Sequence, residues 1–463
     1  MKKMSALKNV AFLILLIVIG YACNDDDDPI IIPDPLTIVD TAIATPDLSN
    51  LVAALQAADG DLVSVLNGNG PFTVLAPTNS AFETFLSANG FASLNDVPTD
   101  VLSQILLNHV ISGSVTSTDL TAAGSGYSKT NADGAAGQKI DIYFNTTNGV
   151  IFNGISTVTS ADISASNGIV HIVDTVIGLP TIVTHAVANP NLSSLVGALT
   201  TGGNTTFTDL LSSDGPFTVF APTNDAFTNF TNPRSNDLNA ILSNHVVVGA
   251  SALSTGLSNG YVKTAATFDN TDSNLSLYIN TDNGVVLNGI STVAAADIIA
   301  TNGVIHVVDK VIDLPNIVDF TLADPTFETL VAALTRDDLT FDYVTTLSTP
   351  LDTSPAPFTV FAPTNTAFGD LLTELGVGSL ADIAEPTLKA TLDHHAVAGA
   401  NVLSTMLTDN MTVVTLGGDI TANVTGGATL TDANGRISSI TAIDIQAANG
   451  VIHEINKVIL PPL

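Results

Sequence analysis

PFTVLAPTNSAF occupies residues 71–82, and it returns as PFTVFAPTNDAF at residues 216–227 and as PFTVFAPTNTAF at residues 357–368. Ten of the twelve positions are identical in all three copies. The copies begin 145 and 141 residues apart, which is much longer than the ~20 to 50 residues of a solenoid or propeller repeat. Each copy therefore marks a whole domain.

A second phrase closes each of the three units. NGIVHIVDTVIGLP begins at Asn167, NGVIHVVDKVIDLP at Asn302 and NGVIHEINKVILPP at Asn449. A length of 463 residues also suits three domains of about 150 residues each. We therefore predict three tandem domains, at residues 36–180, 181–315 and 316–463.

The composition indicates folded, acidic domains. Hydrophobic residues make up 45% of the chain and charged residues 12%, which supplies apolar material for three cores and argues against disorder. Lys and Arg number 12 against 44 Asp and Glu, for a formal net charge of −32. Because the nucleic-acid backbone selects Lys and Arg, this sign predicts no nucleic-acid partner.

Residues 1–22 have the pattern of a secretory signal peptide. Lysines precede an apolar run from Val10 to Ile19, and this run is shorter than the about 20 apolar residues of a transmembrane helix. The single cysteine, Cys23, follows. Its place resembles the lipobox of bacterial lipoproteins, in a loosened Bacteroidetes form with Gly20 where Leu is usual. The resemblance implies lipidation of Cys23, and a soluble secreted protein with a stray thiol is the alternative.

An acidic block and a proline-rich segment follow this cysteine. Asp25, Asp26, Asp27 and Asp28 stand together, and PIIIPDPL leads into the first unit. The block resembles the surface-export signal of Bacteroidetes lipoproteins, and a simple spacer is the alternative. We predict that residues 23–35 form an extended tether. The protein would then be an outer membrane lipoprotein exposed on the cell surface, meeting the membrane through its lipid anchor only.

Each unit divides into a helical half and a strand-rich half. TPDLSNLVAALQ places Leu48, Leu51, Val52 and Leu55 on one face of a helix. PFTVLAP predicts a short buried strand that Pro77 ends, and the Thr-Asn pair after it predicts a helix cap. Strand-like segments separated by Asn-Gly turns follow. Helices first and antiparallel strands second predict an α+β domain.

The TVFAPTNxAF block, the Asn-His-Val segment and the closing NGxxHxxDxVIxLP block together resemble the fasciclin-like domain family, in this order in all three units. The resemblance covers nearly the whole chain after the tether. It implies that each unit is a β-sheet wedge with helices packed along one side. It also implies extracellular adhesion without a shared catalytic activity.

Two units depart from the common pattern. The Pro of APTN and the His of the Asn-His-Val segment are 32 residues apart in units one and three but 23 apart in unit two, from Pro222 to His245. We expect a lost or shortened helix in unit two. In unit three the hairpin before the closing block is rewritten as ATLTDANGRISSI. The family's aromatic-His pair, which is associated with integrin recognition, is Asn108-His109 in unit one, so that role is not carried over.

Six of the eight histidines fall at two repeated positions. A functional interpretation would make them metal ligands or a pH switch, and a structural one makes them buried and bonded to backbone. The spacing favours the structural interpretation. The APTN prolines and asparagines are likewise architectural, although this rim is also a candidate partner contact, with the residues Thr78, Asn79, His109, Thr223, Asn224, His245, Thr364, Asn365 and His395.

The three units lack the common sequence signatures of enzymes. GxSxG, GxxxxGK[ST] and CxxC motifs do not occur. Asp162, Asp297 and Asp444 each stand nine residues before a strand histidine, which is compatible with a site carboxylate or with a turn or bulge. We predict no enzyme, no cofactor and no dedicated metal site, with non-specific Ca²⁺ binding by surface carboxylates left open. Thr41 is a candidate for O-glycosylation.

These observations predict a non-enzymatic surface protein whose three domains make multivalent contact with extracellular matrix, glycan or a cell-surface protein of another cell. The alternative is surface capture of a small apolar ligand or polysaccharide for an uptake system, which requires a sizeable pocket in at least one unit.

Overall fold

The computed structural model describes residues 35–200, 206–269 and 271–462. Three units of similar architecture follow one another, and we call them repeats 1, 2 and 3. Repeat 1 opens with helices, namely α1 (Ile38–Ala44), the 3-10 turn η1 (Pro46–Leu48), α2 (Ser49–Ala57) and α3 (Leu62–Leu66). The strand β1 (Phe72–Pro77) comes next, and further helical segments follow it, namely α4 (Asn79–Ala88), η2 (Leu94–Asp96) and α5 (Thr99–Asn108).

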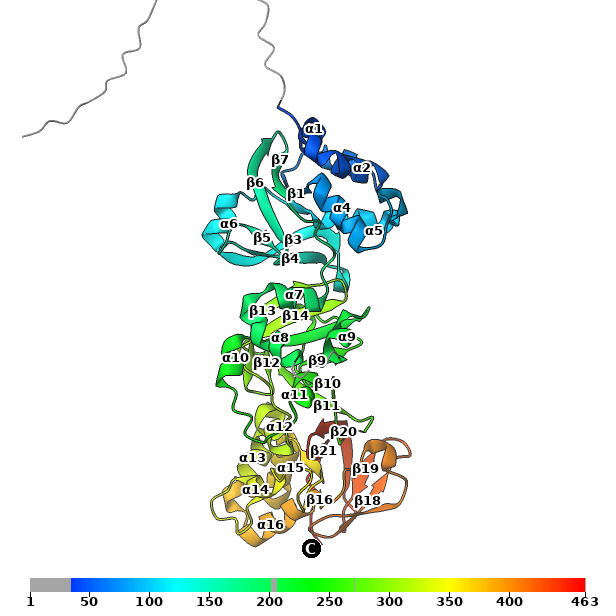
Figure 1. Ribbon diagram of the computed structural model, residues 1–463. Helices are drawn as coiled ribbons and strands as arrows, with labels where there is room; N and C mark the ends of the chain where they lie inside the picture. Colours follow the sequence, from blue (N-terminus) through cyan, green and yellow to red (C-terminus); the bar gives the residue numbers. More distant parts are fainter. Residues whose placement is uncertain (1–34, 201–205, 270, 463) are drawn as a thin grey trace, which may run out of the picture. The chain divides into compact units, whose positions relative to one another are not determined.

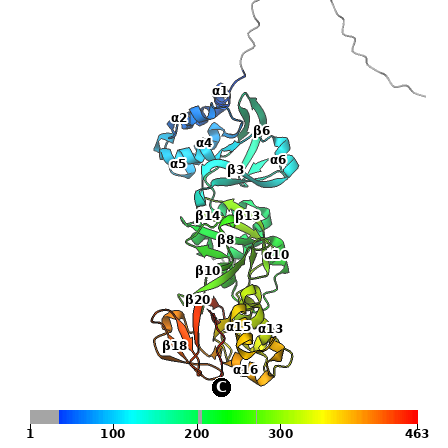
Figure 2. The ribbon, with the colours of Figure 1, turned by 180° about the vertical axis from the view of Figure 1, so that it is seen from behind.

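The second half of repeat 1 is rich in strands. Its elements are β2 (Val110–Ser112), α6 (Ser117–Ala123), β3 (Ser125–Asp133), η3 (Ala135–Gly137), β4 (Lys139–Asn145), β5 (Ile151–Phe152), β6 (Ser156–Ala165) and β7 (Gly168–Val173). Helices α2, α4 and α5 group on one side of the strands (Figures 1 and 2).

Repeat 2 follows the same plan. Its described elements are α7 (Ile182–Ala188), η4 (Pro190–Leu192), α8 (Ser193–Leu199), α9 (Thr206–Ser212), β8 (Phe217–Pro222), α10 (Asn224–Asn229), α11 (Leu238–Ser243), β9 (Val246–Val248), η6 (Ser254–Gly256), β10 (Gly260–Thr267), β11 (Asn274–Asn280), β12 (Val286–Leu287), β13 (Ser291–Ile299) and β14 (Gly303–Val308). Helix α10 has 6 residues where α4 has 10, so the expected shortening in unit two is confirmed.

Repeat 3 has the same order. Its elements are α12 (Ile317–Ala323), η7 (Pro325–Phe327), α13 (Glu328–Leu334), α14 (Tyr343–Leu347), β15 (Phe358–Pro363), α15 (Asn365–Leu375), η8 (Leu380–Asp382), α16 (Glu385–Asp393), β16 (Ala396–Ala398), η9 (Ser404–Met406), β17 (Met411–Val414), β18 (Asp419–Asn423), β19 (Thr429–Thr431), β20 (Ile437–Ala447) and β21 (Gly450–Ile455).

Seven strands form the sheet of each repeat, and in repeat 1 they close into a barrel. The strand of the repeated phrase has a partner on each side: β1 pairs with β2 antiparallel and with β7 parallel, from Phe72 opposite Gly168 to Pro77 opposite Val173. The α+β class is therefore confirmed. The strands of the second half pair antiparallel, as predicted. The parallel pairing of β1 with β7 was not predicted; β1 stands in the helical half of the sequence, and the long connection between the two strands permits a parallel pairing.

The repeated strand separates two cores. In β1, Val74 and Ala76 pack into the cluster between sheet and helices, whereas Leu75 packs into the cluster on the other side. This alternation follows from the two-residue period of a strand. All three side chains are buried, which explains why Val, Leu or Phe, and Ala follow one another here without an alternating polar residue.

Pro77 and Thr78 turn this strand into a helix. The Thr78 Oγ1 accepts the N–H of Ala81 at 3.2 Å and so caps α4, as the sequence predicted. Thr223 and Thr364 cap α10 and α15 in the same way, each at 3.2 Å. A single capping bond of this kind stabilises a helix by about 1 kcal/mol.

Residues Leu36–Leu463 form one compact unit, in which consecutive repeats make direct contacts. At the joint between repeats 1 and 2 (joint 1–2), the Asp141 Oδ2 accepts the N–H of Ile299 at 2.7 Å, and the Lys129 Nζ donates to the carbonyl of Asp297 at 3.4 Å. The Tyr127 hydroxyl accepts from the Asn189 amide at 3.2 Å.

The joint between repeats 2 and 3 (joint 2–3) repeats this pattern. The Ser276 Oγ accepts the N–H of Gln446 at 3.0 Å, and the Lys263 Nζ donates to the carbonyl of Asp444 at 2.6 Å. The Tyr261 hydroxyl donates to the Asp324 carboxylate at 3.0 Å. At both joints, the same two strand positions of one repeat thus contact the bulged strand of the repeat that follows it.

Among the described residues, no single helix has the length and apolar composition to cross a membrane. One bent pair, Ile38–Ala44 with Pro46–Ala57, meets the criteria together.

Candidate functional site

The asparagine of each APTN motif ties two helices together. The Asn79 Oδ1 accepts the N–H of Asn50 at 2.8 Å, and its Nδ2 donates to the carbonyl of Pro46 at 3.0 Å. Asn224 and Asn365 make the same pair of bonds. Both ends of each amide are therefore engaged within the repeat. The Thr-Asn pairs are half-buried in all three repeats, so a partner can reach only their edges.

The helix-end histidines lie inside the fold. His109 is 2% exposed; its Nδ1–H donates to the carbonyl of Ile105 at 2.7 Å, and its Nε2 accepts the N–H of Ile177 at 2.9 Å. His245 and His395 repeat both bonds. Burial lowers the pKa of all three histidines to about 4, so they are neutral at physiological pH. Their ring nitrogens join a helix end to the closing segment.

The strand histidines brace a bulge. The His171 Nε2–H donates to the carbonyl of Val115 at 2.9 Å, and its Nδ1 accepts the N–H of Asp162 at 3.2 Å. Asp162 has a left-handed backbone, with φ of 58°, and its Oδ1 accepts the N–H of Ser117 at 2.8 Å. Asp297 with His306 and Asp444 with His453 repeat this arrangement. The nine-residue spacing therefore reflects a β-bulge in all three repeats.

The asparagine that opens each closing phrase has a role that the sequence interpretation missed. Asn167 lies in the turn between β6 and β7, as its Asn-Gly sequence predicted, but its side chain is also buried. Its Nδ2 donates to the carbonyls of Leu66 and Gly68 at 2.7 and 2.9 Å, and its Oδ1 accepts the N–H of Ile38 at 2.9 Å. Asn302 and Asn449 do the same. Invariance of this Asn in all three copies was the available signal.

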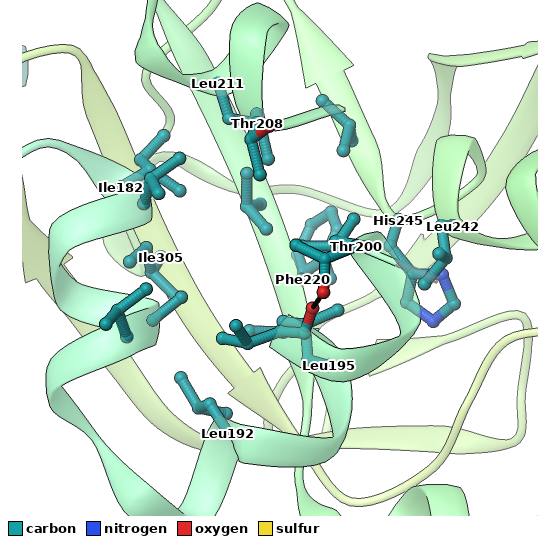
Figure 3. A pocket seen from close by; sticks show the side chains of 18 residues that line it. Ile182, Leu192, Leu195, Thr200, Thr208, Leu211, Phe220, Leu242, His245 and Ile305 are labelled. Atoms are coloured by element: carbon teal, nitrogen blue, oxygen red, sulfur yellow. Dashed lines mark hydrogen bonds between the residues drawn. The ribbon is translucent and has the colours of Figure 1, made fainter. Parts of the chain in front are cut away.

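Repeat 2 contains an apolar cavity of about 90 Å³ between its first helices and its sheet (Figure 3). Helices α7, α8 and α9 supply Ile182, Leu195 and Leu211, and the sheet supplies Phe220 and Ile305. The lining of this cavity is mostly hydrocarbon. The ligand-capture alternative required a pocket in at least one unit, but the sequence did not predict which residues would line it.

Comparison with known proteins identifies the repeats. The Fasciclin domain model matches residues 46–180, 190–315 and 325–461. The chain belongs to the fasciclin-domain family. Each repeat is one fasciclin domain, and the resemblance noted in the sequence is confirmed.

Relatives of this fasciclin-domain chain occur in bacteria and animals. Protein sll1483 of Synechocystis is 37% identical over 31% of this chain and 73% of its own length. Human periostin is 26% identical over 92% of this chain and 47% of its own length, and the pig transforming growth factor-beta-induced protein ig-h3 is 26% identical over 90% of this chain and 56% of its own length. The chain thus spans about half the length of these animal relatives.

A solved pair of FAS1 domains from the insect cell adhesion molecule fasciclin I is also similar. It is 20% identical, covers 57% of this fasciclin-domain chain and 96% of its own length, and has a TM-score of 0.37.

The remaining predicted sites concern the lipid anchor, the acidic block, the glycosylation candidate and metal binding. Cys23 and the block Asp25, Asp26, Asp27 and Asp28 lie outside the described residues. Thr41 lies in α1, where its hydroxyl donates to the carbonyl of Thr37 at 2.8 Å. Within residues 35–200, 206–269 and 271–462, no three His, Cys, Asp or Glu side chains are placed to hold one metal ion.

Proposed function

We propose that this chain is a non-enzymatic adhesion protein that uses its three fasciclin domains for multivalent contact. The observation that carries the proposal is the presence of three copies of a domain that also occurs in a cell adhesion molecule. The repeated polar residues hold backbone groups together in every copy. Their recurrence is explained by the architecture, so it does not require a shared reaction.

Multivalency is the mechanism that we propose. Three linked modules raise avidity well above the affinity of any single contact, provided that the linkage lets them engage together. The joints hold consecutive repeats through several hydrogen bonds each. The three contact surfaces would then be presented in a fixed relation, and matrix, glycan or a cell-surface protein remains the proposed partner class.

Anchoring at the surface completes this proposal. Lipidation of Cys23 would attach the chain to the outer membrane, and the acidic block after it would direct the protein to the outer face. A protein with a formal net charge of −32 repels another copy of itself. We therefore propose that contacts between two copies depend on divalent cations that bridge carboxylates.

A bead assay tests the proposal. Beads coated with residues 36–463 are applied to the parent cells and their matrix, in calcium and then in chelator, at high and low coating density. We expect retention that rises steeply with density and falls in chelator. Failure to retain beads under every condition would contradict adhesion.

A triple variant tests where contact occurs. Ser80, Asp225 and Thr366 are exposed and stand directly after the APTN motifs, and replacing each with Arg alters the rim without touching its hydrogen bonds. The matched control places three arginines at the equivalent exposed positions Thr118, Thr255 and Thr405. We expect the rim variant alone to lose retention. Equal retention by both variants would move the contact elsewhere.

A further inference from the structure

The polar side chains that line the cavity of repeat 2 within the described part of the chain all have hydrogen-bond or other partners. The Thr200 hydroxyl, on its wall, donates to the carbonyl of Val196 at 2.9 Å (Figure 3). Both ring nitrogens of His245 are bonded to backbone, to Ile241 and Ile312, and Thr208 has a partner as well. A water molecule inside would lack the two to four polar partners that hold buried water. The cavity is therefore suited to hydrocarbon.

Its size selects among hydrocarbons. An apolar cavity of about 150 Å³ holds benzene, whereas this one has about 90 Å³. A slim, unbranched chain of a few carbon atoms fits such a space better than a ring. The wall reaches the protein surface at Val187, whose side chain is 64% exposed, and at Thr200, which is also exposed. A chain end can enter there from solvent.

Repeat 3 has a cavity of the same volume at equivalent positions. It is lined by Val331, Leu347 and Val360 where repeat 2 has Val196, Leu211 and Val219. Its volume is also about 90 Å³. The same packing arrangement therefore leaves the same apolar space in two copies of the domain, although their sequences have diverged.

We propose that the cavity of repeat 2 is a binding site for the end of an unbranched alkyl chain, with its polar group left outside at the mouth. The net charge of −32 favours a neutral or cationic head group over an anionic one. The inference is independent of the adhesion proposal, and it gives the domain a ligand of defined chemistry.

A series of straight-chain alcohols tests this proposal. Residues 36–463 carry labelled Ile, Leu and Val methyl groups and are titrated with propanol to octanol while methyl NMR shifts are followed. Each added CH₂ is expected to tighten binding about fourfold until the cavity is full, after which affinity levels off. The shifts should centre on Ile182, Val196 and Leu211. Shifts spread over the surface, or benzene binding more tightly than hexanol, would overturn the proposal.

Cavity-filling variants provide the controls. Val196→Phe should abolish the shifts in repeat 2 and leave those at Val331 unchanged. The matched control is Val52→Phe at the equivalent, half-buried position of repeat 1, which should leave the repeat 2 shifts intact. If Val196→Phe does not fold, Val187→Trp at the exposed mouth replaces it and is expected to weaken binding at least tenfold. Unchanged binding in the folded variant would exclude this cavity.

Discussion

The two joints place different side chains at the same positions. At joint 1–2 the carboxylate of Asp141 accepts an amide of the next repeat, and at joint 2–3 the hydroxyl of Ser276 does so. Beside the joint tyrosine lies the His185 ring at joint 1–2, at 5.6 Å between centroids, and the Phe320 ring at joint 2–3, at 5.4 Å. The common elements are the bulged backbone and the Tyr and Lys of the preceding repeat. The geometry of docking therefore resides in the bulge, and the side chains adjust its strength and pH response.

The largest expected effect comes from the joint tyrosines. Tyr261→Ala removes an aromatic ring that packs on Tyr278 and Phe320, together with the bond to Asp324, and should weaken joint 2–3 by about 3 kcal/mol. Hydrogen exchange at the Gln446 amide should then accelerate about 100-fold, while the Ile299 amide is unchanged. Tyr127→Ala is the reciprocal control. Equal acceleration of both amides would show that the joints do not open separately.

The second-largest expected effect is that acidification weakens joint 1–2 more than joint 2–3. Burial lowers the pKa of His185 to about 4, and opening the joint would restore its ordinary value of about 6.5. The closed joint thus disfavours the protonated His185 ring. The stability of joint 1–2 is therefore fully present above pH 6.5 and is lost as the pH falls toward 4. At pH 5 the loss is about 2 kcal/mol. The exchange rate of the Ile299 amide relative to that of Gln446 should rise on going from pH 7 to pH 5, and His185→Phe should cancel this change.

The hydrogen-bond acceptors Asp141 of joint 1–2 and Ser276 of joint 2–3 are expected to contribute different amounts of stability. Burial raises the pKa of Asp141, but its contact with the Lys129 Nζ at 2.6 Å supports the charged form. Asp141→Ala leaves both the Ile299 amide and Lys129 without this acceptor, and because Lys129 is half exposed we expect a loss of about 2 kcal/mol. Ser276→Ala removes a neutral bond and should cost about 1 kcal/mol. Hydrogen exchange at the Ile299 amide measures the effect of Asp141→Ala, and exchange at the Gln446 amide measures that of Ser276→Ala. A larger effect for Ser276→Ala would contradict the expected order.

The smallest effects concern the joint lysine. Lys263→Val removes the bond to the Asp444 carbonyl and should weaken joint 2–3 by about 1 kcal/mol. In repeat 3 the pairing of Val414 with Asp419 matches that of Lys263 with Ser276, and Val414 is 66% exposed. Val414→Lys should therefore change the melting temperature by no more than the equivalent of about 0.5 kcal/mol. Calorimetry on residues 36–463 compares the two variants.

Local sequence was sufficient to predict the centre of each repeat. The apolar run to Pro77, followed by Thr78, specifies a buried strand and a helix cap because both depend on residues close in sequence. The structural role of the histidines was also anticipated, although not their bonds. His109 meets Ile177 across 68 residues, a distance at which periodicity carries no information.

The contacts missed by sequence reasoning are all long-range. The Asn-Gly signal correctly placed Asn167 in a turn. The bonds of its side chain to Ile38 and Leu66 were missed because they span 129 and 101 residues. Asp141 and Ile299 are 158 residues apart, and neither belongs to a repeated phrase. The cavity of repeat 2 depends on how three helices pack, which a sequence pattern does not determine.

Strand β17 of repeat 3 differs from its counterparts in repeats 1 and 2 in a way that affects contacts between molecules. A surface that docks on a different surface of the next copy makes a head-to-tail contact, and such contacts between separate molecules build rings or open filaments. Repeats 1 and 2 each use their Tyr and Lys for the following repeat, whereas repeat 3 has Thr412 and Val414 at those positions. Repeat 3 therefore lacks the Tyr and Lys with which repeats 1 and 2 hold the following repeat. The bonds that link the three repeats within one molecule thus have no counterpart on this face of repeat 3, which disfavours head-to-tail growth between separate molecules.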